Sequence, residues 1–404
     1  MNDVLAAGNK GPKVKGDCYV TFDPLHGAEL KVVVQSKVNS LFGESIQSLA
    51  MQMLAYYGIE QGYLHIDDSG AFDFVIAARI EACVKKAVIT DKNYLPSMIP
   101  ENTNASSKRR LRLSRLYIPG NTPKMIINAG VYHPNAVILD LEDAVAIAKK
   151  DEARLLVRNA LRQVDFYGAE RMVRINQLPL GLTDLEQVVP HAVQVILVPK
   201  CESGDEVRQV NDKIAQIKEN ESIGHDIYLM PIIESSKGVL NAVEIASSGS
   251  NVIALAIGLE DYTADLGVKR TLDGMESLYA RSHLVNVCKA HGIQAIDSVF
   301  SDVGASESLK ENVLHSKALG FEGMGCIHPR QIKIIHESYA PATDEIEKAK
   351  QIVMAFENAT EKGMGVVSLG TKMIDPPVVE RAQQTIASAI ALGKLSDRWR
   401  VENG

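Results

Sequence analysis

Two acidic residues, each directly behind an apolar segment, are placed to bind a divalent cation. Glu234 follows the β-branched run 227–233, and Asp261 follows a second such run at 252–257. The spacing leaves room for one helix between the runs, as in a strand–helix–strand unit. Consecutive parallel strands bring their C-terminal residues to the same end of a barrel, where paired oxygen ligands suit Mg²⁺. A single acidic residue in such a position is more often a helix cap or a solvated loop residue, and it is the pair that favours a metal site.

Polar residues also follow the other predicted strands. The strands alternate with helical segments and are expected at 116–118, 136–139, 171–175, 193–198, 227–233, 252–257, 294–296 and 323–327. Eight strands with intervening helices predict an α/β protein with a (β/α)₈ TIM barrel. Further polar or turn-forming residues would then surround the same mouth as the acidic pair: Pro119, Gly120, Asn121, Asp140, Glu142, Asp143, Asn176 and Lys200.

The chain divides into four predicted parts. A polar segment with two prolines, residues 89–110, is the expected linker between two structured regions. A small α+β domain at 13–88 precedes it, the barrel at 111–335 follows it, and a C-terminal extension occupies 336–404. The first dozen residues are polar and are expected to be disordered.

Both outer parts have their own predicted elements. In the small domain we expect strands at 18–22 and 30–34 paired as a hairpin, a helix at 46–57, a strand at 63–66 and a helix at 72–86. In the extension we expect a helix at 343–360, a hairpin at 363–374 and a helix at 377–392, which is too much structure for a barrel cap alone.

Composition excludes several classes of protein. The 404 residues are 46% hydrophobic and 23% charged, as in ordinary globular proteins, and the net charge of −7 argues against a nucleic-acid partner. No apolar run approaches the roughly 18 residues of a membrane span, so we expect no membrane association. The five cysteines have no CxxC spacing and indicate neither a disulfide framework nor a zinc site. A reducing, cytoplasmic location fits this pattern best.

The barrel resembles the citrate lyase β-subunit family, the HpcH/HpaI-like barrels that also include malyl-CoA and citramalyl-CoA lyases. The resemblance runs from about residue 112 to the end of the chain and rests on nine motifs in order. They are 115–121 (RLYIPGN), 139–145 (LDLEDAV), 173–176 (VRIN), 198–200 (VPK), 233–235 (IES), 258–261 (GLED), 279–282 (YARS), 326–329 (CIHP) and 372–375 (KMID). Each motif alone is weak, but the ordered set is specific.

This resemblance implies roles for individual residues. Glu234 and Asp261 would hold Mg²⁺, and Arg174 would offer its planar fork of donors to a developing oxyanion or a substrate carboxylate. Asp375 resembles the family's acid/base aspartate, which lies on a C-terminal segment that reaches over a neighbouring subunit's barrel. The residues also allow a plainer interpretation, in which Arg174 pairs with Asp140 or Glu142 across the barrel mouth.

Other positions are expected to support the site or to contact coenzyme A. Asp140, Glu142 and Asp143 would form a support network for Arg174 and for metal-bound water. Asn176 and Lys200 would either take part in that network or be satisfied polar groups at strand ends. The turn formed by Pro119, Gly120 and Asn121, with Arg115 nearby, would lie close to the CoA phosphates, although a turn motif alone is not specific.

The N-terminal domain resembles the citrate lyase acyl carrier protein, the γ subunit. The resemblance covers residues 16–87 and rests on GDC at 16–18, PL at 24–25, FGESI at 42–46, GYLHIDDSGA at 62–71 and ARIEA at 78–82. In that family a serine just before the Gly-Asp pair carries the prosthetic group, whereas this chain has Lys15 there. An amine cannot form the phosphodiester, so we expect no attached prosthetic group. The domain would be a relic that packs or oligomerises, or would keep the carrier's docking position while the barrel accepts free CoA thioesters.

The resemblance implies a Mg²⁺-dependent carbon–carbon lyase. Its substrate would be a 3-hydroxy-3-carboxy acyl-CoA thioester such as citramalyl-, malyl- or citryl-CoA, and its products acetyl-CoA or a related acyl-CoA and a keto acid. We expect a homo-oligomer, a trimer or hexamer, whose sites are completed between subunits. The alternatives are a fused β/γ subunit of citrate lyase, a malyl-CoA thioesterase or condensing enzyme, and a non-catalytic assembly subunit. The acidic pair, Arg174 and Asp375 argue against the last of these.

Overall fold

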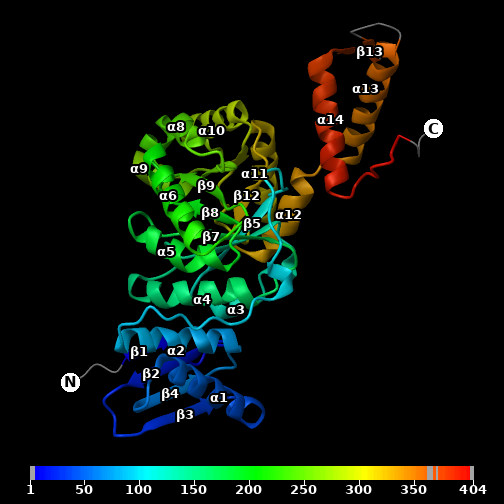
Figure 1. Cartoon of the computed structure of the whole chain (residues 1–404). Coiled ribbons are helices and arrows are strands. Elements are labelled where there is room, and N and C mark those ends of the chain that lie inside the picture. The colour runs from blue at the N-terminus through cyan, green and yellow to red at the C-terminus, as the bar shows by residue number, and fades with distance from the viewer. Residues whose placement is uncertain (1–4, 362–366, 370–371, 401–404) are drawn as a thin grey trace. The chain divides into compact units, whose positions relative to one another are not determined.

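The computed structural model describes residues 5–361, 367–369 and 372–400, and these form two compact units, Met1–Ile332 and Lys333–Gly404. The first unit contains the N-terminal module, the predicted linker and the barrel (Figure 1). No helix in the described part of the chain is long and apolar enough to cross a membrane.

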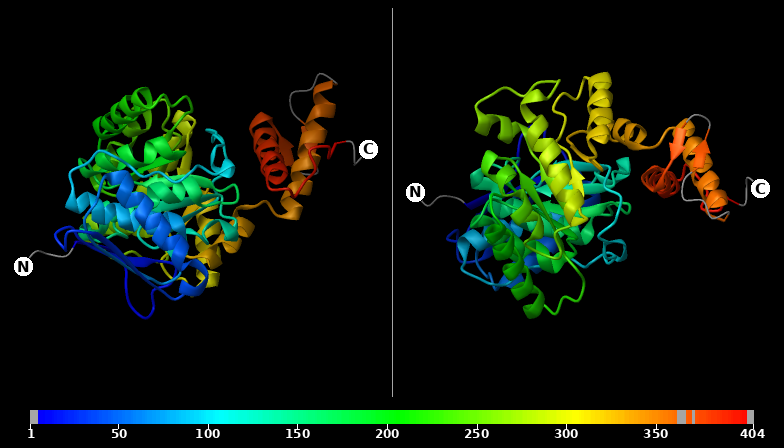
Figure 2. Two further views of the ribbon diagram at one scale, coloured as in Figure 1. Left: turned by 60° about the horizontal axis from the view of Figure 1, so that its bottom comes forward. Right: turned by 90° about the horizontal axis from the view of Figure 1, so that it is seen from above.

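The N-terminal module is a four-stranded sheet with two helices. Its elements are β1 (Leu5–Gly8), β2 (Cys18–Asp23), β3 (Leu30–Ser36), α1 (Asn39–Tyr57), β4 (Gly62–Asp68) and α2 (Asp73–Ala87). Alternate residues of β2 are buried, as expected for a sheet covered by helices on one face (Figure 2). The expected disorder of the first dozen residues is wrong for Leu5–Gly8, because this segment pairs antiparallel with β2.

The predicted hairpin between the second and third strands is also wrong. The strand order is β1-β2-β4-β3, so β4 lies between β2 and β3. It pairs antiparallel with β2 and parallel with β3, and α1 forms the crossover from β3 to β4. The alternating pattern indicates which face of a strand is buried but does not choose its neighbour.

The barrel has the eight predicted strands. They are β5 (Ser114–Pro119), β6 (Ala136–Asp140), β7 (Glu170–Arg174), β8 (Val195–Val198), β9 (Tyr228–Ile233), β10 (Ala254–Ile257), β11 (Gln294–Ile296) and β12 (Met324–Cys326). Neighbouring strands are parallel, and a bridge between Asp297 and Met324 closes the sheet from β11 to β12. Apolar side chains such as Ile138, Met172 and Met230 form its core. The predicted (β/α)₈ barrel is therefore confirmed.

Helices connect these strands around the outside of the barrel. Their bounds are α3 (Pro123–Ile126), α4 (Lys150–Gln163), α5 (Leu180–Val188), α6 (Gly204–Asn220), α7 (Ser236–Leu240), α8 (Ala242–Ser247), α9 (Leu259–Leu266), α10 (Leu278–His291), α11 (Ser306–Leu319) and α12 (Pro329–Tyr339). Register sets the height of the polar strand ends, because Pro119 pairs with Asp140 and Asp140 with Arg174. These three residues therefore lie level at one end of the barrel.

Buried ion pairs join the module to α4 of the barrel. Glu81 of α2 pairs with Arg158 of α4 at 2.6 Å, and both side chains are inaccessible to solvent. Arg79 of α2 lies 3.4 Å from Glu152 of α4. The predicted linker also packs on the barrel, since Asn102 donates to the carbonyl oxygens of Leu161 and Val164. The module is thus a fixed part of the first unit and not a tethered domain.

The second unit is a helical pair with a short hairpin. Its elements are α13 (Thr343–Glu361), β13 (Val367–Leu369), β14 (Lys372–Ile374) and α14 (Pro376–Ala391), and the two strands pair antiparallel. Part of the predicted hairpin, residues 363–366 and 370–371, lies outside the described residues. Val353, Ala382, Ile386 and Trp399 are buried together in its core.

Candidate active site

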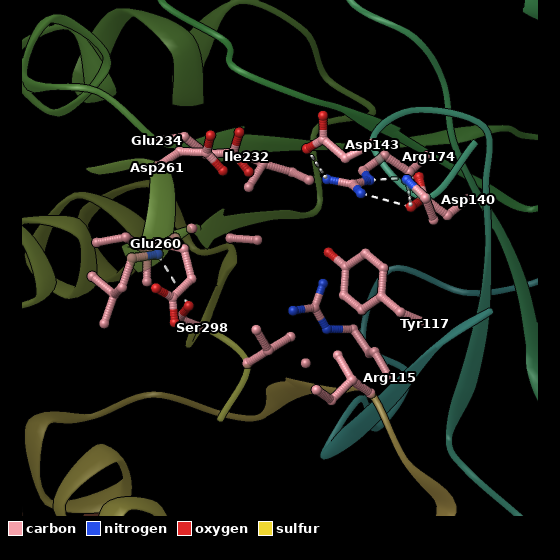
Figure 3. Close-up of a pocket in the computed structure, with 18 of the residues that line it drawn as sticks. Arg115, Tyr117, Asp140, Asp143, Arg174, Ile232, Glu234, Glu260, Asp261 and Ser298 are labelled. Atoms are coloured by element: carbon pink, nitrogen blue, oxygen red, sulfur yellow. Dashed lines mark hydrogen bonds and ion pairs between the residues drawn. The ribbon is translucent and has the colours of Figure 1, made fainter. Parts of the chain in front are cut away.

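A cavity of about 460 Å³ opens at the C-terminal ends of the barrel strands. Strands β5, β6, β7 and β9–β12, or the segments that follow them, contribute residues to its lining (Figure 3). Its polar lining includes Arg115, Tyr117, Asp140, Asp143, Arg174, Glu234, Glu260, Asp261, Asp297 and Ser298. The structure therefore brings together the predicted metal pair, the predicted arginine and most of their predicted support.

Three carboxylates hold the Arg174 guanidinium. Its Nε and Nη2 donate to the two oxygens of Asp140 at 2.7 and 2.6 Å, as Figure 3 shows. Its Nη1 lies 2.7 Å from Glu142 and 3.6 Å from Asp143. Burial alone would lower the pKa of this arginine, but the bonds and charge of Asp140 outweigh burial and raise it. Arg174 is thus a fixed cation at the cavity wall, and the ion pairing that the sequence left open is present.

Lys200 links this network to Asp261. Its Nζ lies 3.1 Å from Glu142, 3.5 Å from Asp143 and 3.6 Å from Asp261. Burial alone would lower the pKa of the ammonium group, but the negative charges of these carboxylates outweigh burial and raise it. Lys200 has a φ of 47°, a left-handed conformation that is uncommon for a residue with a side chain. Such strain is retained where the surroundings fix the residue, as three acidic partners do here.

Glu234 is a buried carboxylate with an unpaired oxygen. Among the described residues its Oε2 has no hydrogen-bond partner, and only 5% of the residue is exposed. Burial and, next, the charge of Asp261 raise the pKa of Glu234 to about 8. A β-carbon at Gly258 would lie 2.6 Å from Glu234 Oε1, so the glycine leaves the space that this carboxylate occupies.

These observations fit a site for Mg²⁺. An unpaired buried oxygen is costly, and a hard divalent cation satisfies it. Glu234 and Asp261 supply two carboxylates, while Mg²⁺ commonly keeps water and takes substrate oxygens as its other ligands. No group of three or more metal-binding side chains occurs in the described part of the chain, which is compatible with such a two-carboxylate site.

Tyr117 and Arg115 line the cavity from β5. The Arg174 guanidinium carbon lies 5.4 Å from the centre of the Tyr117 ring. Arg115 is only 1% exposed, and its Nη1 lies 2.8 Å from Met230 Sδ. Tyr117 has no role predicted from the sequence. Strand periodicity was an available signal, because Arg115, Tyr117 and Pro119 occupy alternate positions of one strand and point to the same side.

The turn after β5 faces partly away from the cavity. Pro119 lines the cavity, whereas Gly120 packs closely against Asp140, whose carbonyl oxygen would lie 2.7 Å from a β-carbon at this position. The Asn121 carbonyl accepts from Asn9 and Arg79 of the N-terminal module at 3.3 and 3.4 Å. This part of the predicted CoA site therefore lies at the junction with the module.

Two predicted residues lie apart from the cavity lining. The backbone N–H and side-chain amide of Asn176 both donate to Asp184 Oδ2, at 2.6 and 2.8 Å. Asn176 is therefore a buried, satisfied strand-end group. Asp375 belongs to the second unit, where its side chain accepts from the Val378 N–H at 3.2 Å and caps α14. Its predicted acid/base role stays a prediction.

Residues 113–329 match the model of the HpcH/HpaI aldolase/citrate lyase family. The chain belongs to this family. It is 38% identical to a citrate lyase subunit beta of Leuconostoc mesenteroides subsp. cremoris, over 70% of this chain and 95% of the relative. It is 31% identical to the human mitochondrial citramalyl-CoA lyase, over 76% of this chain and 94% of the relative.

A solved structure and a second family model extend the comparison. The CitE protein of Mycobacterium tuberculosis, solved with magnesium, acetoacetate and coenzyme A, is 28% identical, with a TM-score of 0.59, over 70% of this chain and 99% of that one. Residues 10–87 match the ACP model described as malonate decarboxylase delta subunit (MdcD). The predicted family and the carrier-like N-terminal module are thereby confirmed.

Proposed function

We propose that the chain is a Mg²⁺-dependent carbon–carbon lyase that cleaves a 3-hydroxy-3-carboxy acyl-CoA thioester. The observation that carries the proposal is the unpaired, buried Glu234 oxygen beside Asp261, in the same cavity as Arg174. Homologues with lyase names and the CitE complex with magnesium and coenzyme A support it. The substrate class comprises citramalyl-, malyl- and citryl-CoA.

The residues of the site suit the cleavage. When bound by Glu234 and Asp261, Mg²⁺ supplies a Lewis acid for the oxygens of the hydroxy acid. The C3 hydroxyl gives its proton to water in the cavity, the C3–O bond becomes the keto carbonyl, and the C2–C3 bond breaks so that its electron pair passes to the thioester as an enolate. Of the five N–H groups of Arg174, two donate to Asp140, and Nη1 forms an ion pair with Glu142. The others lie in the cavity wall as donors to a substrate carboxylate or to the oxygen on which charge develops.

The enolate must then take a proton at carbon. We assign this step to Asp375 of a neighbouring subunit, which requires a homo-oligomer. We propose a trimer or hexamer, located in the cytoplasm. A carboxyl group can deliver that proton only within hydrogen-bond reach of the carbon. Arg174, held in its charged form by Asp140, does not release a proton and is left with the electrostatic role.

The test is a metal-dependence assay of the intact enzyme. Release of keto acid from citramalyl-, malyl- and citryl-CoA is measured with Mg²⁺ and with a chelator, for wild type and Asp261→Ala. We expect turnover of at least one thioester by wild type and, because Asp261 is one of two protein ligands, a loss of roughly 10³-fold or more in the variant. Asp265→Asn is the matched control, since Asp265 lies one turn further along α9 and, among the residues that the structure describes, bonds only to Ser236. Full turnover by Asp261→Ala, or in chelator, contradicts the metal assignment.

A further inference from the structure

The N-terminal module places one of its loops beside the mouth of the barrel. The Asn9 side chain donates to Asp17 at 2.8 Å and to the Asn121 carbonyl at 3.3 Å. Arg79 binds both oxygens of Asp17 at 3.0 Å and also reaches the Asn121 carbonyl. Lys149 of the barrel donates to the Gly8 carbonyl at 2.8 Å. Residues 8–17 are therefore held against the loop that follows β5.

This arrangement brings Lys15 close to Lys124 of α3. A β-carbon at Gly16 would lie 3.8 Å from the Lys124 α-carbon, so the two short segments are in van der Waals contact. Met125, the next residue of α3, lines the active-site cavity and is 39% exposed. Lys124 is thus adjacent in sequence to a residue of the cavity lining, and Lys15 is adjacent to the glycine that contacts Lys124.

Both lysines are exposed cations, and no ion pair involving either is present in the described part of the chain. The nearby lysines of the barrel are already engaged, since Lys149 pairs with Glu152 and Lys150 donates to two backbone carbonyls. The nearest acidic residue of the loop, Asp17, is neutralised by Arg79. On a chain with a net charge of −7, this local positive charge favours an anionic ligand.

We propose that Lys15 of the N-terminal module, together with Lys124, binds the phosphate groups of the CoA moiety of the substrate. The inference rests on the proposed function, because a thioester whose acyl end occupies the cavity carries its diphosphate and 3′-phosphate outside it. A lysine ammonium group binds phosphate as a point charge. Lys15 lies outside the family match at 113–329, so the module adds a contact that the barrel alone does not have.

The test compares substrates with and without the phosphates. For Lys15→Glu we expect KM for the CoA thioester to rise about tenfold, as loss of one charge-assisted contact implies. The values of kcat, and of KM for the corresponding acyl-pantetheine thioester, should stay at the wild-type level. Lys124→Glu should behave in the same way. Lys31→Glu, an exposed position on β3 of the same module, is the charge-matched control and should change neither KM.

A binding measurement separates this proposal from the proposed reaction. Titration calorimetry with adenosine 3′,5′-bisphosphate requires no turnover, and we expect Lys15→Glu to weaken its binding about tenfold while Lys31→Glu does not. If wild type cleaves no thioester but this difference is found, the reaction is wrong and the phosphate site stands. Equal binding by wild type and Lys15→Glu, or an equal rise in KM for both thioesters, overturns the proposal.

Discussion

At the scale of single residues, the contacts of the Arg174 guanidinium are compatible with both a structural role and the chemical role proposed for it. Asp140 accepts two hydrogen bonds with its two oxygens and Glu142 forms an ion pair with Nη1, so the plane of the side chain is fixed. A surface ion pair contributes little to stability, but here the pairing orients a cation at a cavity wall. The two interpretations of Arg174 that the sequence allowed are therefore compatible, because the same contacts that satisfy the arginine also position it.

The substitution Arg174→Lys tests this dual role. A lysine keeps the charge but loses the planar fork, so we expect kcat/KM to fall by about 10²- to 10³-fold, as for the loss of one preorganised donor. Mg²⁺ affinity, measured by calorimetry, should change much less, because Arg174 is not a ligand. A lysine variant with wild-type kcat/KM would show that positive charge alone is sufficient.

At the scale of elements, the packing of α2 on α4 attaches the carrier-like module firmly to the barrel. Glu81 and Arg158 form a fully buried pair between these helices, and Arg158 also donates to the Asn159 side chain and the Tyr94 carbonyl. Breaking a buried pair leaves an uncompensated charge, which is more costly than replacing both partners with apolar groups. The interface therefore binds the module to the barrel through specific partners.

Removing one partner of this pair should destabilise the first unit. For Glu81→Ala we expect a loss of about 3–5 kcal/mol in the free energy of unfolding by urea, because Arg158 stays buried without its carboxylate. The double replacement Glu81→Leu with Arg158→Met should recover most of this loss. Arg208→Ala breaks only exposed pairs with Asp205 and Glu244 and should cost about 1 kcal/mol or less. Equal losses for Glu81→Ala and Arg208→Ala would contradict the importance of the interface.

At the scale of the whole molecule, the predicted catalytic groups are divided between two compact units. The metal pair and Arg174 belong to Met1–Ile332, while Asp375 belongs to Lys333–Gly404. Within its own unit Asp375 caps α14, which follows directly from its position before two prolines. A cap of this kind holds the carboxylate at the start of a helix.

Mixed oligomers test whether Asp375 acts on a neighbouring subunit. Asp375→Ala and Asp261→Ala subunits are each expected to be inactive. After dissociation and random reassembly, about a quarter of the sites should combine an intact metal pair with an intact Asp375 from another chain. Recovery of activity is measured with the keto-acid assay, and reassembly is verified by native mass spectrometry. Activity that stays at the level of either parent after verified reassembly would exclude catalysis between subunits.

Much of this protein was predictable from local patterns in the chain. Apolar runs alternating with amphipathic segments indicated the barrel, and the polar residues behind those runs indicated its functional end. Both follow from short-range physics, because strand length and burial depend on neighbouring residues. The prediction of Glu234 and Asp261 as a metal pair follows from this pattern, since parallel strands all deliver their C-terminal ends to one mouth, whereas the role predicted for Arg174 came from the family resemblance.

Only the tertiary structure decided which groups meet. Periodicity indicates that a face is buried but not what covers it. For this reason the sequence did not predict that β4 lies between β2 and β3, or that Leu5–Gly8 pairs with β2. The bond from Asn176 to Asp184 and the approach of Gly16 to Lys124 likewise join segments from different elements. Such contacts depend on how complete elements pack against one another. The local sequence does not specify which distant segments will come into contact.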